Sequence, residues 1–151
     1  MAKVLIKKLN SGVELPIYKT NGASGMDLMA FLEASIKISP NSSYLVPTGL
    51  SIAFSEDYEV QIRPRSGLAV KNSITVLNTP GTIDSDYRGE IKIILFNHGK
   101  EDFIINNKDR VAQMILTPVI KMELEEIDNL PDTLRGEGGF GSTGKWKANW
   151  I

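Results

Sequence analysis

The sequence predicts an all-β protein, a sandwich or jelly roll with a single short helix. Short runs rich in β-branched and aromatic residues recur along the chain, separated by clusters of Gly, Pro, Asn, Asp and Ser. In YEVQIRPR the apolar residues Val60 and Ile62 alternate with Glu59, Gln61 and Arg63, which is typical of a strand with one buried face. No window keeps a helical periodicity for about three turns.

Each expected element is a run bounded by turn residues. The expected strands are, in chain order, VLIKKL (4–9), SIKIS (35–39), YLVPTGLSIAF (44–54), YEVQIRP (58–64), ITVL (74–77), EIKIILFN (90–97), DFIIN (102–106), RVAQMILTPVI (110–120) and MELEEI (122–127). In NGASGMDLMAF (21–31), an apolar strand that contains Asp27 is expected after a flexible Gly-Ala-Ser-Gly lead. One short helix is expected over Ser66–Asn72, because Ser66 can cap it ahead of Leu68.

Length and composition indicate one globular domain. The chain has 151 residues, of which 42% are hydrophobic and 23% charged, enough for one core and too few for two ordinary domains. A net charge of -1 and a pI near 5.9 give no basic surface, so we expect no nucleic-acid partner. The sequence has no cysteine, which excludes disulfides, thiolate zinc sites and cysteine nucleophiles.

The N-terminal stretch MAKVLIKKLNSG lacks the apolar core of a signal peptide. Nowhere in the sequence do about 18 apolar residues follow one another, as a transmembrane helix requires. We therefore expect a soluble, cytoplasmic protein without a membrane partner.

The composition changes at Pro131, and we expect a β domain over residues 1–130 followed by a flexible C-terminal arm over residues 131–151. Five glycines fall within Arg135–Gly144, so this segment cannot bury enough surface to be ordered by itself. A floppy terminus is the ordinary interpretation. The residues that favour a binding role instead are Arg135, Phe140, Ser142 and Thr143. They supply a cation, a ring and two hydroxyls among glycine amides that can approach an anion closely.

Two arginines meet a Ser-Gly pair in RPRSGLAVKN (63–72). The start of a helix offers free amides to an anion, and Arg65 adds a forked donor suited to phosphate. A strand-to-helix corner with solvated arginines explains the same residues equally well. Pro64 slightly favours a functional role, because it fixes the backbone between the arginines.

Two polar residues need a separate explanation. Asp27 lies in an apolar strand, where a carboxylate is costly unless other groups satisfy it. An edge-strand charge, or a carboxylate that accepts backbone amides, explains it better than a direct ligand role. His98 is the only histidine and is expected in a turn, so a Ser-His-Asp relay is not supported.

The stretch NTPGTIDSDYRGE (78–90) connects two apolar runs and is expected to be a hairpin connection. Turn chemistry alone explains its Asn, Asp, Gly and Pro residues. Asp84 and Asp86 point the same way if the segment is extended, and a turn between them would change this. An aspartate, an arginine corner and a Gly-rich arm with Arg and Phe together suit attack of water on a phosphorus atom.

Five segments in chain order resemble the five motifs of the trimeric dUTP pyrophosphatases (dUTPases): ASGMDLMA, RPRSGLA, NTPGTIDSDYRG, RVAQMI and RGEGGFGSTG. The resemblance spans Ala23 to Gly144, and five motifs in order with suitable gaps are highly specific. It implies a distorted jelly-roll, β-clip-like barrel that forms a homotrimer with active sites at subunit boundaries. It also implies magnesium-assisted hydrolysis of dUTP to dUMP and pyrophosphate, which keeps uracil out of DNA and supplies dUMP for dTTP synthesis.

The resemblance assigns the catalytic and phosphate-binding roles. Asp84 is implied to orient and deprotonate the water that attacks the α-phosphorus, and a positioned general base contributes about 10² to 10⁴ in rate. Mg²⁺ spans the triphosphate, and Asp27 acts through metal-bound water or local structure. The residues implied to hold phosphates are Arg65, Ser66, Gly67 and Gln113, joined by Arg135, Gly141, Ser142 and Thr143 of the arm.

Recognition of the nucleoside follows from the same resemblance. The residues implied to contact uracil are Asn78, the backbone of Thr82, Ile83 and Asp84, Lys92 nearby, and the ring of Phe140. Tyr87 packs under the deoxyribose, where a 2′-hydroxyl would clash. Polar groups left unpaired by cytosine can discriminate by about 10⁴ to 10⁵, whereas rejection of thymine must be steric. Trp146 and Trp150 lie beyond the last motif and receive no role from it.

Two alternatives remain open. A dCTP deaminase on the same scaffold shares the Ile-Asp loop but typically lacks the Tyr87 ring and the Gly-rich arm, and it would release ammonia. A non-enzymatic jelly-roll or capsid-like module would leave Asp84, Arg65 and the arm idle. Assembly without nucleotide and without turnover would favour that second alternative.

Overall fold

The computed structural model describes residues 2–139 of the chain, which falls into two compact units, Met1–Ile120 and Lys121–Ile151. We expected the boundary at residue 130, further along the chain. Residues 121–139 of the second unit contain no helix or strand, so the strand expected at 122–127 is wrong. Met122 and Leu124 are 85% and 87% exposed, and an alternating pattern forms a strand only where a partner strand and a buried face exist.

The first unit confirms the expected all-β class with one short helix. Its strands are β1 (Leu5–Lys8), β2 (Met26–Met29), β3 (Ile36–Ile38), β4 (Ser43–Pro47), β5 (Leu50–Ala53), β6 (Tyr58–Arg63), β7 (Ile74–Val76), β8 (Gly81–Ile83), β9 (Lys92–Asn97), β10 (Phe103–Ile105) and β11 (Arg110–Pro118). The helix is α1 (Ser66–Asn72), and no helix in the described part of the chain is long and apolar enough to span a membrane.

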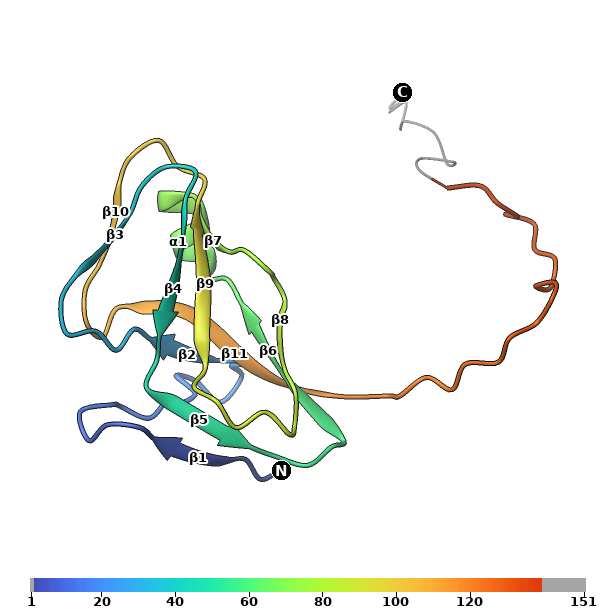
Figure 1. Ribbon diagram of the computed structural model, residues 1–151, viewed down its shortest axis with the longest axis horizontal. Helices are drawn as coiled ribbons and strands as arrows, with labels where there is room; N and C mark the ends of the chain where they lie inside the picture. Colours follow the sequence, from blue (N-terminus) through green and yellow to red (C-terminus); the bar gives the residue numbers. More distant parts are fainter. Residues whose placement is uncertain (1, 140–151) are drawn as a thin grey trace. The chain divides into compact units, whose positions relative to one another are not determined.

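The strands form four antiparallel sheets, in the orders β2-β11-β6-β8, β4-β9-β7, β1-β5 and β10-β3. Figure 1 shows β4 and β9 side by side, with α1 next to β7. The run expected as one strand over 44–54 is two strands in different sheets, because the chain turns at Gly49. Gly49 has φ +68°, and a Cβ there would meet Val13 at 2.4 Å.

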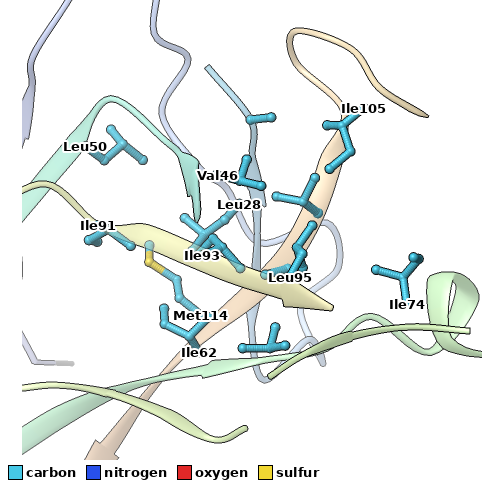
Figure 2. Packing of buried hydrophobic residues seen from close by; sticks show 14 of the residues in the cluster. Leu28, Val46, Leu50, Ile62, Ile74, Ile91, Ile93, Leu95, Ile105 and Met114 are labelled. Atoms are coloured by element: carbon cyan, nitrogen blue, oxygen red, sulfur yellow. The ribbon is translucent and has the colours of Figure 1, made fainter. Parts of the chain in front are cut away.

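Buried side chains of the two larger sheets meet in one hydrophobic cluster (Figure 2). Leu28 of β2 and Ile93 of β9 are both 0% exposed, and Figure 2 shows them together at its centre. Val60 and Ile62 of β6 are 3% exposed, whereas Arg63 is exposed, so the alternation expected for this strand is confirmed. The side chains of β6 that reach solvent are therefore the polar ones, with Arg63 at its end the most exposed.

The connection from β7 to β9 is not a simple hairpin. These two strands do pair, but the chain between them leaves their sheet and forms β8, which pairs with β6. Strand β8 was not predicted from the sequence, because it has only three residues, Gly81, Thr82 and Ile83, and they lie among turn residues. The Thr79–Pro80 peptide bond just before it is cis.

Helix α1 has the expected bounds but not the expected cap. Arg65 is the N-cap residue, with an extended backbone at φ -93° and ψ 127°, and no side chain caps the helix. The Arg65 carbonyl instead accepts the amides of Leu68 and Ala69, which makes Ser66 the first helical residue. The helix ends at Ser73, in the left-handed conformation.

Candidate active site

Asp84 lies in the turn directly after β8. The amide of Tyr87 donates to the Asp84 carbonyl at 3.1 Å, so a turn separates Asp84 from Asp86 and the two do not share the face of an extended strand. The Asp84 carboxylate is exposed and makes no hydrogen bond or ion pair with any residue in 2–139. It is therefore available to accept a proton from a water molecule.

Of the residues expected to read the base, Thr82 and Ile83 lie in β8 directly before Asp84, Asn78 precedes that strand, and Lys92 begins β9. Strand β8 is an edge of its sheet, so one side of its backbone has no partner strand and can bond to a ligand. Thr82 is exposed and Ile83 half-buried. The Asn78 amide lies against Gly81, where an added Cβ would come within 3.2 Å of its nitrogen. Lys92, at the start of β9, pairs with Glu90 at 3.6 Å.

Arg65 turns from the β6–α1 corner toward β2 and β11. Its Nε donates to Asp27 Oδ1 at 2.9 Å, and its Nη1 donates to the Arg110 carbonyl at 2.9 Å. Asp27 Oδ2 accepts a weaker bond from Arg110 Nη1 at 3.4 Å. The carboxylate of edge strand β2 is thus held between two guanidinium groups, which explains how the charge is tolerated.

Arg110 had no predicted role, although it is the first residue of the motif-like segment RVAQMI. Its pairing with Asp27 spans 83 positions of the chain, so the contact follows from the β2–β11 register and not from any local pattern. Gln113 faces Asp27 in that register, and its Nε2 donates to the Pro64 carbonyl at 2.9 Å. Gln113 thereby ties β11 to the corner that carries Arg65.

A basic pocket of about 440 Å³ lies beside this corner. Its lining residues are Arg65, Leu68, Phe103, Ile104, Lys108, Asp109, Arg110 and Val111. The Lys108 ammonium donates to Glu14 and holds the pKa of that carboxyl below its ordinary value. Ser66 and Gly67 are exposed, and a Cβ on Gly67 would meet nothing within 4 Å, so their backbone is open to approach.

Asp84 and Arg65 of one chain lie far apart. Ile83, which precedes Asp84, pairs with Val60 of β6, whereas Arg65 follows Arg63 at the end of that strand. Val60 and Arg63 are about 10 Å apart along β6, so Asp84 and Arg65 are separated by at least that distance in the strand direction. The Arg65 guanidinium contacts β2, which lies three strand spacings, about 14 Å, across the sheet from β8. The two groups are therefore separated by roughly 17 Å or more.

The second unit places Arg135 in a local turn. Its Nε donates to the Gly138 carbonyl at 2.8 Å, and the Gly138 amide donates to the Arg135 carbonyl at 3.1 Å. Phe140, Gly141, Ser142 and Thr143 lie outside the described residues, as do Trp146 and Trp150.

No group of three His, Asp or Glu side chains within residues 2–139 is placed to hold a metal ion. Mg²⁺ commonly keeps several waters and binds through one or two carboxylates together with substrate phosphates. Single carboxylates such as Asp27 and Asp84 are compatible with a Mg²⁺ ion that is bound mainly by substrate phosphates.

The fold and these residues define a class: an all-β protein with an edge strand, an exposed aspartate directly after it that is unpaired among residues 2–139, and an arginine corner beside a basic pocket. The family profile described as dUTPase matches residues 12–144, and the chain belongs to the dUTPase family.

Relatives extend over nearly the whole chain. A deoxyuridine 5′-triphosphate nucleotidohydrolase of Nautilia profundicola is 54% identical over 143 residues, which is 95% of this chain and 99% of the relative. The protein with the same description from Alkaliphilus metalliredigens is 54% identical over 144 residues, 95% of this chain and 99% of that relative.

Solved structures confirm the jelly-roll-like fold. A glycine-to-serine mutant of the Staphylococcus bacteriophage 80alpha dUTPase with dUpNHpp superposes with a TM-score of 0.84 at 20% identity, covering 95% of this chain and 99% of that one. An aspartate-to-asparagine mutant of the dUTPase from phage phi11 of S. aureus, described with a structural Mg(II) ion, gives a TM-score of 0.77 at 18% identity, over 86% and 99% of the two chains.

Asp27→Asn is expected to lower kcat/KM for dUTP by about 10- to 100-fold, because the neutral amide no longer holds both arginines and small displacements of positioning groups are costly. Asp102→Asn, which removes an exposed ion pair with Lys37, is the matched control and should stay near wild type. Steady-state kinetics at low and high magnesium concentration check this. Wild-type kinetics would contradict the arginine-holding role, and recovery at high magnesium would assign Asp27 to the metal instead.

Proposed function

We propose that this chain hydrolyses dUTP to dUMP and pyrophosphate, which keeps uracil out of DNA and supplies dUMP for dTTP synthesis. The observation that carries the proposal is the Asp84 carboxylate, exposed and unpaired among residues 2–139, directly after an edge strand that can read a base. Membership of the dUTPase family supports the same substrate.

Asp84 is the general base in this proposal. Its carboxylate takes a proton from a water molecule, the water oxygen forms a bond to the α-phosphorus, and the bond from that phosphorus to the bridging oxygen breaks to release pyrophosphate. Arg65, Ser66, Gly67 and Gln113 hold the phosphate oxygens. Removal of a single such donor typically costs about 10² to 10³ in kcat.

Magnesium is proposed as the cofactor, carried mainly by the substrate phosphates, and when bound it neutralises their negative charge. Asp27 is proposed to support it indirectly, through water. The bonds that Asp27 accepts from Arg65 and Arg110 suit this indirect role, because each leaves its carboxylate oxygen a further lone pair that a metal-bound water can donate to.

A homotrimer with active sites at subunit boundaries is proposed from the separation of Asp84 and Arg65. A gap of roughly 17 Å is too large for a base and a phosphate clamp of one chain to act on adjacent phosphates. A second copy must then supply one of the two groups, and a closed ring of copies satisfies every site.

The nucleoside and arm contacts complete the proposed site. The residues proposed to contact the base are Asn78, Thr82, Ile83, Asp84, Lys92 and, stacked on uracil, Phe140. Tyr87 is proposed to pack under the deoxyribose and to exclude a 2′-hydroxyl. The arm residues proposed to reach the phosphates are Arg135, Gly141, Ser142 and Thr143. A cytoplasmic location is proposed as well, since a sequence without cysteine suits a reducing compartment.

Pyrophosphate release measured side by side with dUTP, dTTP, dCTP and UTP tests the function. dUTP should be turned over at least about 10⁴-fold more efficiently than dCTP, because cytosine leaves polar groups of the pocket unpaired. Ammonia released from dCTP would identify a deaminase. No turnover of any of the four by an assembled protein would favour a binding module.

A further inference from the structure

We propose that residues Arg88–Ile91 form a fixed support for the Tyr87 ring, here called the Tyr87 seat, and that Gly89 and Glu90 are positioning residues for the choice between deoxyribose and ribose. The proposal rests on the proposed function, in which Tyr87 packs under the sugar. Neither Gly89 nor Glu90 touches substrate in that function. Gly89 acts through Tyr87, whereas Glu90 acts through Tyr87 and also pairs with Lys92 at 3.6 Å, so Glu90→Gln, which removes the charge but keeps an oxygen, separates the two effects.

The Tyr87 ring lies directly over the seat. Its hydroxyl donates to the Glu90 carbonyl at 3.0 Å. A Cβ added to Gly89 would lie 2.2 Å from the Tyr87 Oη and 2.5 Å from Cζ, so the ring occupies the space that any other residue's side chain would need. The ring thus has its present position only because residue 89 is glycine.

Arg88, Glu90 and Ile91 of the seat are bonded to the β4–β5 corner. Ser51 Oγ donates to the Arg88 carbonyl at 2.8 Å, and the Gly49 amide donates to Glu90 Oε1 at 2.8 Å. The Ile91 amide and carbonyl bond to the Leu50 carbonyl and the Thr48 hydroxyl, at 2.8 Å and 2.6 Å. Leu50 and Ile91 are 2% and 0% exposed and Thr48 is 1% exposed, so the two bonds of Ile91 are shielded from water, whereas those of Arg88 and Glu90 are partly buried.

The ring itself is 44% exposed, and burial alone does not fix it. A side chain that excludes a hydroxyl by steric clash must not yield, because a rotation of the ring would remove the clash. The seat supplies that rigidity through one hydrogen bond at the ring's tip and one close contact beneath it. Glu90 connects both parts, since its carbonyl holds the tip and its carboxylate holds the segment to Gly49.

Gly89→Ala and Glu90→Ala should each raise the ratio of kcat/KM for UTP to that for dUTP by roughly tenfold or more, the scale of a small steric discrimination. The methyl group that Gly89→Ala adds would meet the flexible end of Tyr87 and not the backbone, so the fold should survive. Glu90→Gln keeps an oxygen for the Gly49 amide and should restore the wild-type ratio. Gly22→Ala, where a Cβ meets nothing within 4 Å, is the matched control.

The Tyr87→Ala variant distinguishes a failure of the seat proposal from a failure of the proposed role of Tyr87. If Tyr87→Ala raises the ratio while folded Gly89→Ala and Glu90→Ala keep it at the wild-type value, the seat is refuted and the role of Tyr87 stands. If Tyr87→Ala leaves the ratio unchanged, or the wild type does not turn over dUTP, both the seat and the role of Tyr87 are overturned. A raised ratio in Glu90→Gln equal to that in Glu90→Ala would also refute the carboxylate's part.

Discussion

Asp84→Asn is expected to lower kcat for dUTP by about 10² to 10⁴-fold, the contribution of a positioned general base. An amide of the same shape cannot take a proton from water. KM should change little, because the base is proposed to be read by backbone groups that the substitution leaves in place. The fold should persist as well, since the exposed Asp84 side chain makes no bond within residues 2–139.

Asp86→Asn provides the matched control. Asp86 is exposed in the same turn and differs from Asp84 mainly in its position relative to β8. Single-turnover measurements of pyrophosphate release separate the chemical step from product release in both variants. Turnover of Asp84→Asn within a few-fold of wild type would remove Asp84 from the catalytic role, and an equal loss in Asp86→Asn would show that the turn's charge matters and not one carboxylate.

Much of the fold was predictable from local patterns. Alternation in β6 placed Val60 and Ile62 in the core correctly, because burial of one sheet face imposes a period of two. Strands were expected over 90–97 and 110–120, and β9 (Lys92–Asn97) and β11 (Arg110–Pro118) lie there. The helix bounds were predicted from Ser66 ahead of Leu68. The cap assigned to Ser66 was wrong, because the extended Arg65 already accepts the first helical amides through its carbonyl.

Long-range pairing was not predictable in the same way. β8 is recognisable only once β6 lies beside it, since three residues carry too little pattern. Met122 and Leu124 alternate with glutamates as in a strand, yet both remain exposed because nothing among the described residues buries one face. Local periodicity shows which face of a segment could be buried, but it does not show whether a partner strand lies beside that segment.

The candidate site shows the same division. The quoted motif segments named Asp27, Arg65 and Asp84, but not the ion pair across 38 positions that turns Arg65 toward β2. That contact and the strand order place Arg65 away from Asp84, so a composite site is an inference from topology. The support beneath Tyr87 was likewise not visible in the sequence, because Ser51 and Gly49 bond to Arg88 and Glu90 across 37 and 41 positions of the chain.

Co-assembly of Asp84→Asn chains with Arg65→Ala chains is expected to restore activity that neither variant has alone. Each variant alone, assembled as the proposed homotrimer, should have lost at least about 10²-fold of its turnover, from the missing base or the missing phosphate donor. If a site takes Asp84 from one chain and Arg65 from its neighbour, random mixing in equal amounts leaves both groups intact in about a quarter of the sites. Co-expression with two different tags and sequential purification would isolate the mixed assemblies.

The stringent control mixes Asp84→Asn chains with chains that carry both substitutions. Every site then lacks the aspartate, so no recovery is expected whichever neighbour supplies Arg65. Native mass spectrometry fixes the composition of each preparation, and pyrophosphate release per trimer gives the recovered fraction. Mixed trimers that stay as inactive as the single variants would place Asp84 and Arg65 of one chain in the same site. The roughly 17 Å between them would then have to close when substrate binds, through a rearrangement of the β2-β11-β6-β8 sheet.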